Sequence, residues 1–132
     1  ITSAGKSMRE VTTLMASSNF SNISVYNGND LIGVANGQKI LNSMGQYLIA
    51  GGKCSTFLDN VQIEDMLSTL QNSNYYVVKR ADCTIEEALN EFEHNHKLLA
   101  ILFTKHGQNN ELPLGIMTGA NVVEAQKILE QY

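Results

Sequence analysis

The sequence predicts an α/β protein (α+β in some classifications) built from two βαββα units. The main observation is an internal repeat. The stretch from Ser7 to Gly33 and the stretch from Thr84 to Gly115 follow the same order of helix, strand, turn and strand. A repeat of this size predicts two stacked units that share one core, because each unit alone leaves an apolar face uncovered. The chain of 132 residues is long enough to bury such a core.

The first half is expected to open with an amphipathic helix. Ser7 is its predicted N-cap, and Glu10 three residues later completes a capping-box pattern. The apolar residues at helical spacing are Met8, Val11, Leu14 and Met15. The elements predicted to follow are a strand over residues 22–26, a turn over 27–30, a strand over 31–35 and a helix over 37–49.

The second half is expected to repeat this order after a connecting segment. One helix is predicted in that segment, with Asp59 or Asn60 as its N-cap. The elements predicted after it are a strand over 75–78, a helix that begins after Thr84, a strand over 98–103, a polar loop over 106–111, a strand over 114–117 and a helix over 121–130. The predicted division is a first motif over 1–50, a connecting segment over 51–74 and a second motif over 75–132.

The composition is that of an ordinary globular protein with a mild negative charge. The net charge of -4 and the absence of a basic stripe argue against nucleic acid as a partner. Cys54 and Cys83 have no metal-ligand spacing, which favours a reduced, cytoplasmic setting. No apolar run reaches the roughly 18 residues of a membrane span. Because the chain starts at Ile1 without Met, we expect a piece of a longer protein, which could be the cytoplasmic part of a membrane protein.

Two short motifs recur in both copies. The second copy carries T-I-E-E-A-L over residues 84–89 and L-G-I-M-T-G-A-N over 114–121. The first copy carries S-M-R-E-V-T over 7–12 and I-G-V-A-N-G-Q-K over 32–39. This order of motifs resembles a CBS domain pair, also called a Bateman module. The resemblance implies two motifs packed face to face around a pseudo-two-fold axis, with two clefts that can hold adenine nucleotides.

The resemblance also implies a ligand site in the second copy. Sites in this family use the Thr of the G-h-h-T motif for phosphate and an Asp three residues later for the ribose hydroxyls. Thr118 matches the first position, and Asn121 replaces the Asp at the second. An amide can still accept from one hydroxyl and donate to another. We also expect Tyr76 and Val78 to line the base and Arg80 to reach a phosphate.

The first copy departs further from the family pattern. Asn36 stands in place of the Thr and Lys39 in place of the Asp. Lys39 can donate a hydrogen bond but cannot accept one, so the usual ribose contact is lost. A second cleft formed by Ser3, Asn36 and Lys39 is therefore expected to be empty or to hold only an anion.

The leading functional hypothesis is a regulatory, ligand-sensing module. It would bind AMP, ADP, ATP or another adenosine ligand and signal to an attached or partner protein, such as a transporter, channel or metabolic enzyme. No catalytic residues and no required cofactor are predicted. The alternative is an interaction module that forms a homodimer without any ligand. The apolar helix faces expected to pair are Val11, Leu14 and Met15, and Val122, Ala125 and Leu129.

A remote alternative is a nucleotide hydrolase with a phosphate loop at the start of the chain. Residues 2–7 would complete such a loop if a Gly preceded Ile1, with Lys6 on phosphate and Ser7 on magnesium. No later strand ends in a magnesium-binding Asp. A metal site is also not predicted, because the acidic and histidine residues over 91–96 lack a suitably placed third ligand. Cys83 is expected to be a small, half-buried residue.

Overall fold

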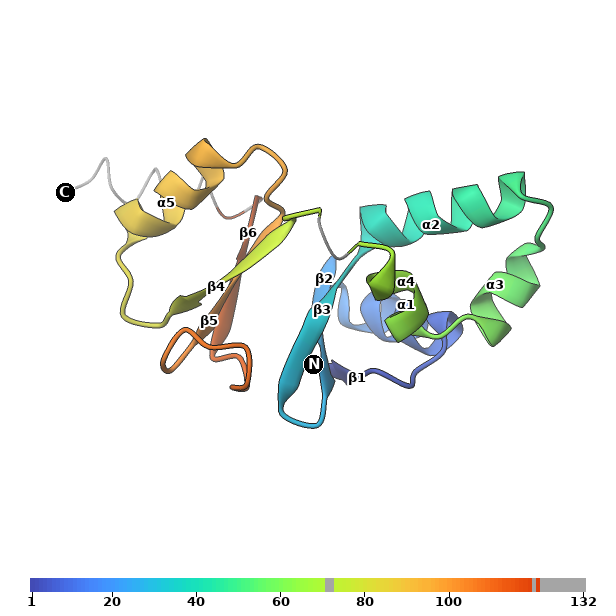
Figure 1. Cartoon of the computed structure of the whole chain (residues 1–132), viewed down its shortest axis with the longest axis horizontal. Coiled ribbons are helices and arrows are strands. Elements are labelled where there is room, and N and C mark those ends of the chain that lie inside the picture. The colour runs from blue at the N-terminus through green and yellow to red at the C-terminus, as the bar shows by residue number, and fades with distance from the viewer. Residues whose placement is uncertain (71–72, 120, 122–132) are drawn as a thin grey trace. The chain divides into compact units, whose positions relative to one another are not determined.

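The computed structural model describes residues 1–70, 73–119 and 121, and these form a mixed α+β protein (Figure 1). The chain divides into two compact units, Ile1–Gln71 (the first unit) and Asn72–Tyr132 (the second unit). The predicted fold class is therefore confirmed. The helix predicted over 121–130 lies outside the described residues except for its first residue.

The first unit contains a three-stranded sheet. Its strands are β1 (Thr2–Ser3), β2 (Asn22–Asn27) and β3 (Asp30–Asn36), in the order β1-β2-β3. β1 runs parallel to β2, and β3 runs antiparallel to it. The predicted turn joins β2 to β3 through Gly28, whose positive φ of 62° suits a residue without a side chain.

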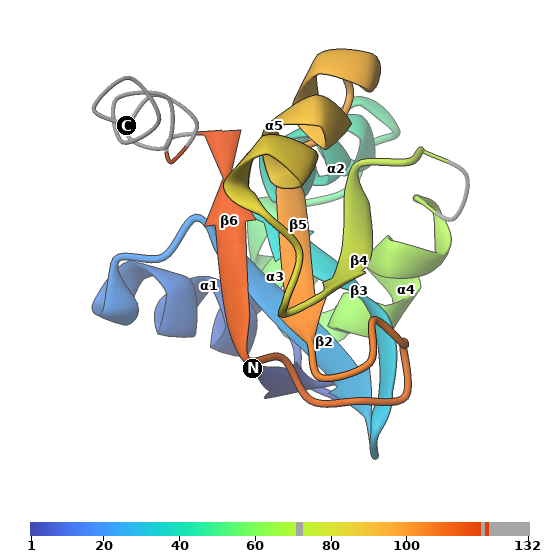
Figure 2. The same ribbon diagram turned by 90° about the vertical axis from the view of Figure 1, so that its left-hand side faces the viewer.

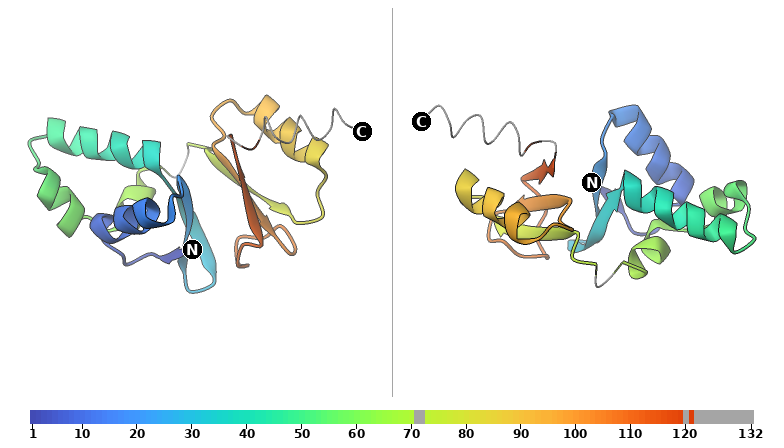
Figure 3. Two further views of the ribbon diagram at one scale, coloured as in Figure 1. Left: turned by 180° about the vertical axis from the view of Figure 1, so that it is seen from behind. Right: turned by 90° about the horizontal axis from the view of Figure 1, so that it is seen from above.

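Helices of the first unit cover one face of this sheet (Figures 1 and 3). The helices are α1 (Met8–Ser18), α2 (Gly37–Ile49), α3 (Cys54–Asn60) and α4 (Ile63–Ser68). All of them contribute to one core with β2 and β3. Ser7 caps α1 as predicted, because its hydroxyl oxygen accepts from the Glu10 N–H at 3.2 Å. The predicted helix over 37–49 is confirmed as α2.

The prediction of a helix capped by Asp59 or Asn60 is wrong. Both residues lie inside α3, and a second helix, α4, starts only after Gln62. The physical reason is a long-range contact, since the Asp59 carboxylate is bound to the Arg9 guanidinium of α1 at 2.5 Å. The Gln62 N–H instead donates to Asp65 at 3.2 Å, in the first turn of α4.

The second unit repeats the strand topology of the first. Its elements are β4 (Tyr76–Arg80), α5 (Ile85–His94), β5 (Ala100–Thr104) and β6 (Gly115–Thr118). The order is β4-β5-β6, with β4 parallel and β6 antiparallel to β5. Thr84 caps α5 by accepting from the Glu87 N–H at 3.1 Å, just as Ser7 caps α1. The common element order of the two copies is thus confirmed, while the pseudo-two-fold relation and the exact motif boundaries stay predictions.

Candidate ligand-binding sites

The strand register of the second unit separates its sheet into two faces. Side chains alternate along a strand, so every second residue shares a face. Val77, Ile101 and Met117 are aligned across the three strands and share a core with Ala88 of α5. Figure 2 shows α5 against one face of the β4-β5-β6 sheet. The opposite face therefore carries Tyr76, Val78, Ile116 and Thr118. We call these four residues the ligand face.

The structure brings Thr118 and Asn121 together where β6 ends. The Asn121 Oδ1 atom accepts from the Thr118 N–H at 2.9 Å and from the Thr118 hydroxyl at 3.2 Å. The chain is helical again at Gly119. A phosphate that accepted from the Thr118 hydroxyl would therefore have to take that hydrogen from Asn121.

Tyr76 lies at the same end of the sheet as Thr118. It is aligned with Ala100, which is in turn aligned with Thr118. The Tyr76 ring packs edge-on against Tyr75, with ring centroids 5.1 Å apart. Burial raises the pKa of Tyr76, so its hydroxyl stays protonated at neutral pH and can donate a hydrogen bond.

Val78 and Ile116 continue the ligand face through Leu102, which lies between them. Ile116 is 42% exposed. The sequence motifs do not single out Ile116, although its position two residues before Thr118 on the same strand places it on the shared face.

Arg80 and Thr118 lie at opposite ends of the second sheet. Arg80 is aligned with Thr104 and lies four residues beyond Tyr76, which is about 13 Å along a strand. Its guanidinium is paired with the Asp82 carboxylate, with Nε and Oδ1 3.2 Å apart. A contact between Arg80 and a ligand phosphate stays a prediction, and it would need a ligand that runs along the sheet.

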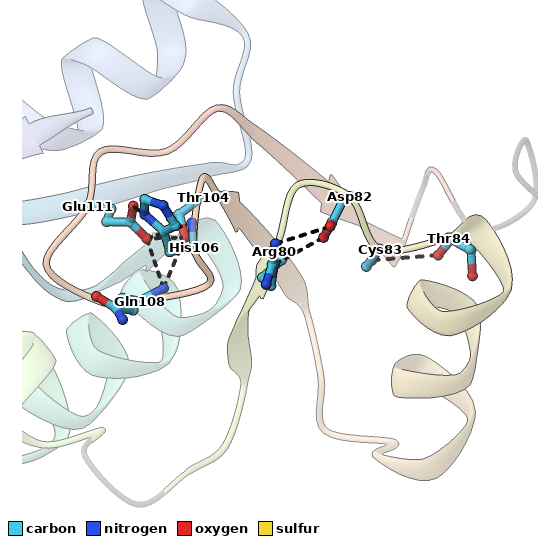
Figure 4. Close-up of polar contacts among 8 residues, drawn as sticks. All are labelled: Arg80, Asp82, Cys83, Thr84, Thr104, His106, Gln108 and Glu111. Atoms are coloured by element: carbon cyan, nitrogen blue, oxygen red, sulfur yellow. Dashed lines mark hydrogen bonds and ion pairs between the residues drawn. The ribbon is translucent and has the colours of Figure 1, made fainter.

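A polar pocket of about 490 Å³ lies at the Arg80 end of the second unit (Figure 4). It is formed by the end of β4, the residues around the start of α5 and the β5–β6 loop. Its lining residues are Val78, Lys79, Arg80, Asp82, Cys83, Glu87, His106 and Gly107. Its cationic side chains already have acidic partners, since Lys79 binds Glu91 at 2.6 Å and Arg80 binds Asp82.

The β5–β6 loop beside this pocket is organised around the Glu111 carboxylate (Figure 4). One oxygen accepts from the Thr104 hydroxyl at 3.1 Å and from the N–H groups of His106 and Gln108 at 2.9 and 3.2 Å. The other oxygen lies 2.7 Å from His106 Nδ1. Burial pushes the pKa of Glu111 upward, but these hydrogen bonds outweigh it and hold the pKa below its usual value.

The other candidate chemistries of the second unit receive no geometric support. Burial raises the pKa of the Cys83 thiol, which disfavours the reactive thiolate. Among the residues that the structure describes, no group of three His, Cys, Asp or Glu side chains could hold one metal ion. Within the same residues, no helix is long and apolar enough to cross a membrane.

In the first unit, Asn36 occupies the start of α2. Its Oδ1 atom accepts from the N–H groups of Gln38 and Lys39 at 3.0 and 3.1 Å. Its amide nitrogen donates to Asn22 Oδ1 at 2.8 Å. The backbone N–H of Lys39 thus contacts Asn36, and the Asn36 side chain is already bonded within the protein. A contact between the Lys39 side chain and an anion stays a prediction.

Ser3 lies at the other end of the first sheet. It is aligned with Tyr26, whereas Asn36 is aligned with Asn22. Asn22 and Tyr26 are four residue steps apart on β2, which corresponds to about 13 Å. Ser3 and Asn36 therefore lie at opposite ends of the first sheet. Within this unit, Ser3 does not lie beside Asn36 and Lys39 as the predicted cleft would require.

The residues of the remote phosphate-loop alternative have other partners. The Lys6 ammonium group lies 3.4 Å from the Glu10 carboxylate. The Ser7 hydroxyl caps α1, and the Lys6 carbonyl oxygen accepts from the Ile63 N–H at 2.8 Å. Thr2 and Ser3, the first two residues of this segment, form strand β1.

An apolar groove of about 600 Å³ lies between α1, α2 and α3 of the first unit. Its lining residues are Thr12, Met15, Ala16, Asn19, Phe20, Ser21, Gly37, Ile40, Leu41, Met44, Cys54, Phe57 and Leu58. None of these is charged, and Phe20 and Leu41 are each 62% exposed. Val11 and Met15, which were expected on an outer face, are instead buried in the core of their own unit. Val122, Ala125 and Leu129 lie outside the described residues.

Comparison with known proteins identifies the fold. No family model and no curated protein matches the sequence. A CBS-domain protein from Burkholderia ambifaria MC40-6 is similar over 99% of this chain and 83% of its own, with a TM-score of 0.68 and 11% identity. CBSX2 in complex with AMP is similar over 98% and 88%, with a TM-score of 0.65 and 19% identity. The CBS domain of a bacterial CNNM/CorC family Mg²⁺ transporter in complex with ATP is similar over 94% and 75%, with a TM-score of 0.63 and 16% identity. The chain therefore has the fold of a CBS domain pair.

Proposed function

We propose that this chain is a regulatory module that binds an adenosine-containing nucleotide at the Thr118 end of its second unit. The observation that carries the proposal is the contact between Thr118 and Asn121, next to a partly exposed ligand face. Similar structures hold AMP or ATP. AMP, ADP and ATP are the candidate ligands, and no further cofactor is required.

Each group at this end has a chemical role toward such a ligand. The Thr118 hydroxyl and the start of the following helix suit a phosphate, because helix N-termini offer N–H donors and partial positive charge. The Asn121 amide can exchange hydrogen bonds with a ribose hydroxyl. Tyr76, Val78 and Ile116 supply an aromatic and aliphatic surface for the base.

We propose that the module has two arrangements and that nucleotide binding changes the balance between them. That change would act on an attached or partner protein. A ligand shifts such an equilibrium only by as much as its affinities for the two arrangements differ. The proposed partner is a transporter, a channel or a metabolic enzyme, and the proposed location of the module is the cytoplasm. The role proposed for the module is regulatory rather than catalytic.

The apolar groove of the first unit favours a second candidate function, association of two copies. A two-fold interface places the same surface against itself, so like charges would repel across it. The groove has no charged lining residue, and its rim carries the exposed Phe20 and Leu41. We propose a homodimer through this groove, which could exist with or without a bound nucleotide.

Calorimetric titration of AMP and ATP tests the ligand proposal. The proteins are the wild type, Asn121→Asp and Thr118→Ala. Asn121→Asp should bind several-fold more tightly, because a carboxylate makes charge-assisted bonds that are roughly twice as strong as neutral ones. Thr118→Ala should bind more weakly. Asn42→Asp, which adds the same charge at an exposed position of α2, is the matched control and should behave like the wild type. If none of the proteins binds either nucleotide, the homodimer proposal remains and the sensing proposal fails.

A further inference from the structure

The start of α2 in the first unit has its backbone donors occupied by the protein itself. The Gly37 N–H donates to the Ser21 carbonyl oxygen at 3.0 Å. The next two N–H groups, of Gln38 and Lys39, both donate to Asn36 Oδ1. These are the groups that a phosphate at a helix N-terminus would need.

The side chain that occupies these donors is itself held in place. Asn36 is only 7% exposed, and its amide nitrogen donates across the β2–β3 pair to Asn22. An incoming phosphate would have to expel a buried amide and leave Asn22 without that hydrogen bond. Buried polar groups without partners are strongly disfavoured.

The corresponding bonds of the second unit run in the opposite direction. Thr118 lies three residues after Gly115, as Asn36 lies three residues after Gly33. There Asn121 accepts from the N–H and hydroxyl of Thr118. Neither of these two bonds uses the backbone N–H group of Gly119 or of Asn121. The two units therefore differ in these side-chain hydrogen bonds. In the first unit the N–H groups of the helix start donate to Asn36, whereas in the second unit Thr118 donates to Asn121.

We propose that Asn36, positioned by Asn22, is an internal substitute for a phosphate and closes the first unit to anionic ligands. The consequence for nucleotides, which rests on the proposed function, is a stoichiometry of one nucleotide per chain, bound at the second unit. Asn36 and Asn22 thereby determine that the two repeats respond differently to one ligand.

Nitrogen-15 NMR with inorganic phosphate tests the closure without any nucleotide. In the wild type, the amide signals of Gln38 and Lys39 should not move saturably as phosphate is added. In Asn36→Ala, which removes both acceptor contacts, these two signals should move and saturate. In Asn36→Ser, whose hydroxyl can accept from only one of the two N–H groups as Ser7 does in α1, the signal of the other group should do so. Asn42→Ala on the same helix is the control and should match the wild type. The serine variant keeps a helix-capping hydroxyl in case the alanine variant folds poorly.

Two results of the phosphate titration would overturn the proposal. One is saturable movement of the Gln38 and Lys39 signals in the wild type, and the other is no movement in either Asn36 variant. Titration with AMP measures the number of AMP molecules bound per chain, which should be one for the wild type. A second bound equivalent in the wild type that Asn36→Ala does not alter also contradicts it. Failure of AMP to bind at all counts against the proposed function and leaves the phosphate result to decide the closure.

Discussion

Leu67 and Gly33 offer a test of how α4 packs against β3. Leu67 is 5% exposed, and a Cβ atom added at Gly33 would lie 3.1 Å from both of its terminal methyl carbons. Leu67→Ala removes three carbon groups worth about 0.8 kcal/mol each, or about 2.4 kcal/mol together. The cavity adds to this, so we expect a loss of roughly 3 kcal/mol in the free energy of unfolding, within the range of about 2–5 kcal/mol for such substitutions.

Gly33→Ala should destabilise for the opposite reason. Gly33 does not have a positive φ, so its backbone accepts alanine, but the new methyl group would crowd Leu67. Overpacking of this kind costs about 1–3 kcal/mol. In the Leu67→Ala background the crowding disappears and the methyl group fills part of the cavity. The same glycine substitution should then be neutral or stabilising, giving a coupling free energy of about 1–3 kcal/mol.

Urea unfolding followed by circular dichroism measures the free energies of unfolding of the wild type, Leu67→Ala, Gly33→Ala and the double variant. The m-values are compared between these four proteins. Leu48→Ala, at a side chain of α2 that is 43% exposed, is the matched control and should cost clearly less than Leu67→Ala. If the two substitutions add to within about 0.5 kcal/mol, position 33 and the Leu67 side chain are not coupled, and the predicted crowding between them is wrong.

Two further predictions concern the homodimer and the β5–β6 loop. Leu41→Glu should convert the wild-type dimer to a monomer in light scattering, whereas Gln46→Glu on the same helix should not; a dimeric Leu41→Glu protein would exclude the groove as the interface. The pKa of Glu111 is lowered in the folded state, so its contribution to stability should be complete above the unfolded value of about 4.3 and decline as the pH falls through the folded pKa. Melting temperatures between about pH 3 and 6 should therefore fall less steeply for Glu111→Gln than for the wild type, and equal slopes would contradict the role of this carboxylate.

Features encoded locally were predictable from the sequence. α2 matches its predicted bounds because apolar spacing and a following glycine pair mark both of its ends. Ser7 caps its helix as expected, and α5 begins after Thr84 as expected, since N-capping needs only the residues that follow within one turn. The contact of Thr118 with Asn121 spans three residues and is equally local.

Features that depend on distant partners were not predictable. The carboxylate of Asp59 binds Arg9, which lies 50 residues away, and no local pattern reveals that this removes it as a cap. Ser3 and Arg80 were grouped with residues that the strand register places at the other end of a sheet. The Asn22–Asn36 bond likewise follows only from the register of β2 and β3.

Mapping AMP onto the assigned amide signals of the intact chain tests where the ligand binds. The signals of Tyr76 and Thr118, at one end of the second sheet, should show the largest saturable changes. Those of Arg80 and His106 at the other end, and of Asn36 in the first unit, should change little. Largest changes at Asn36 or around His106, or no saturable change anywhere at millimolar AMP, would contradict nucleotide binding at the Thr118 end of the second unit.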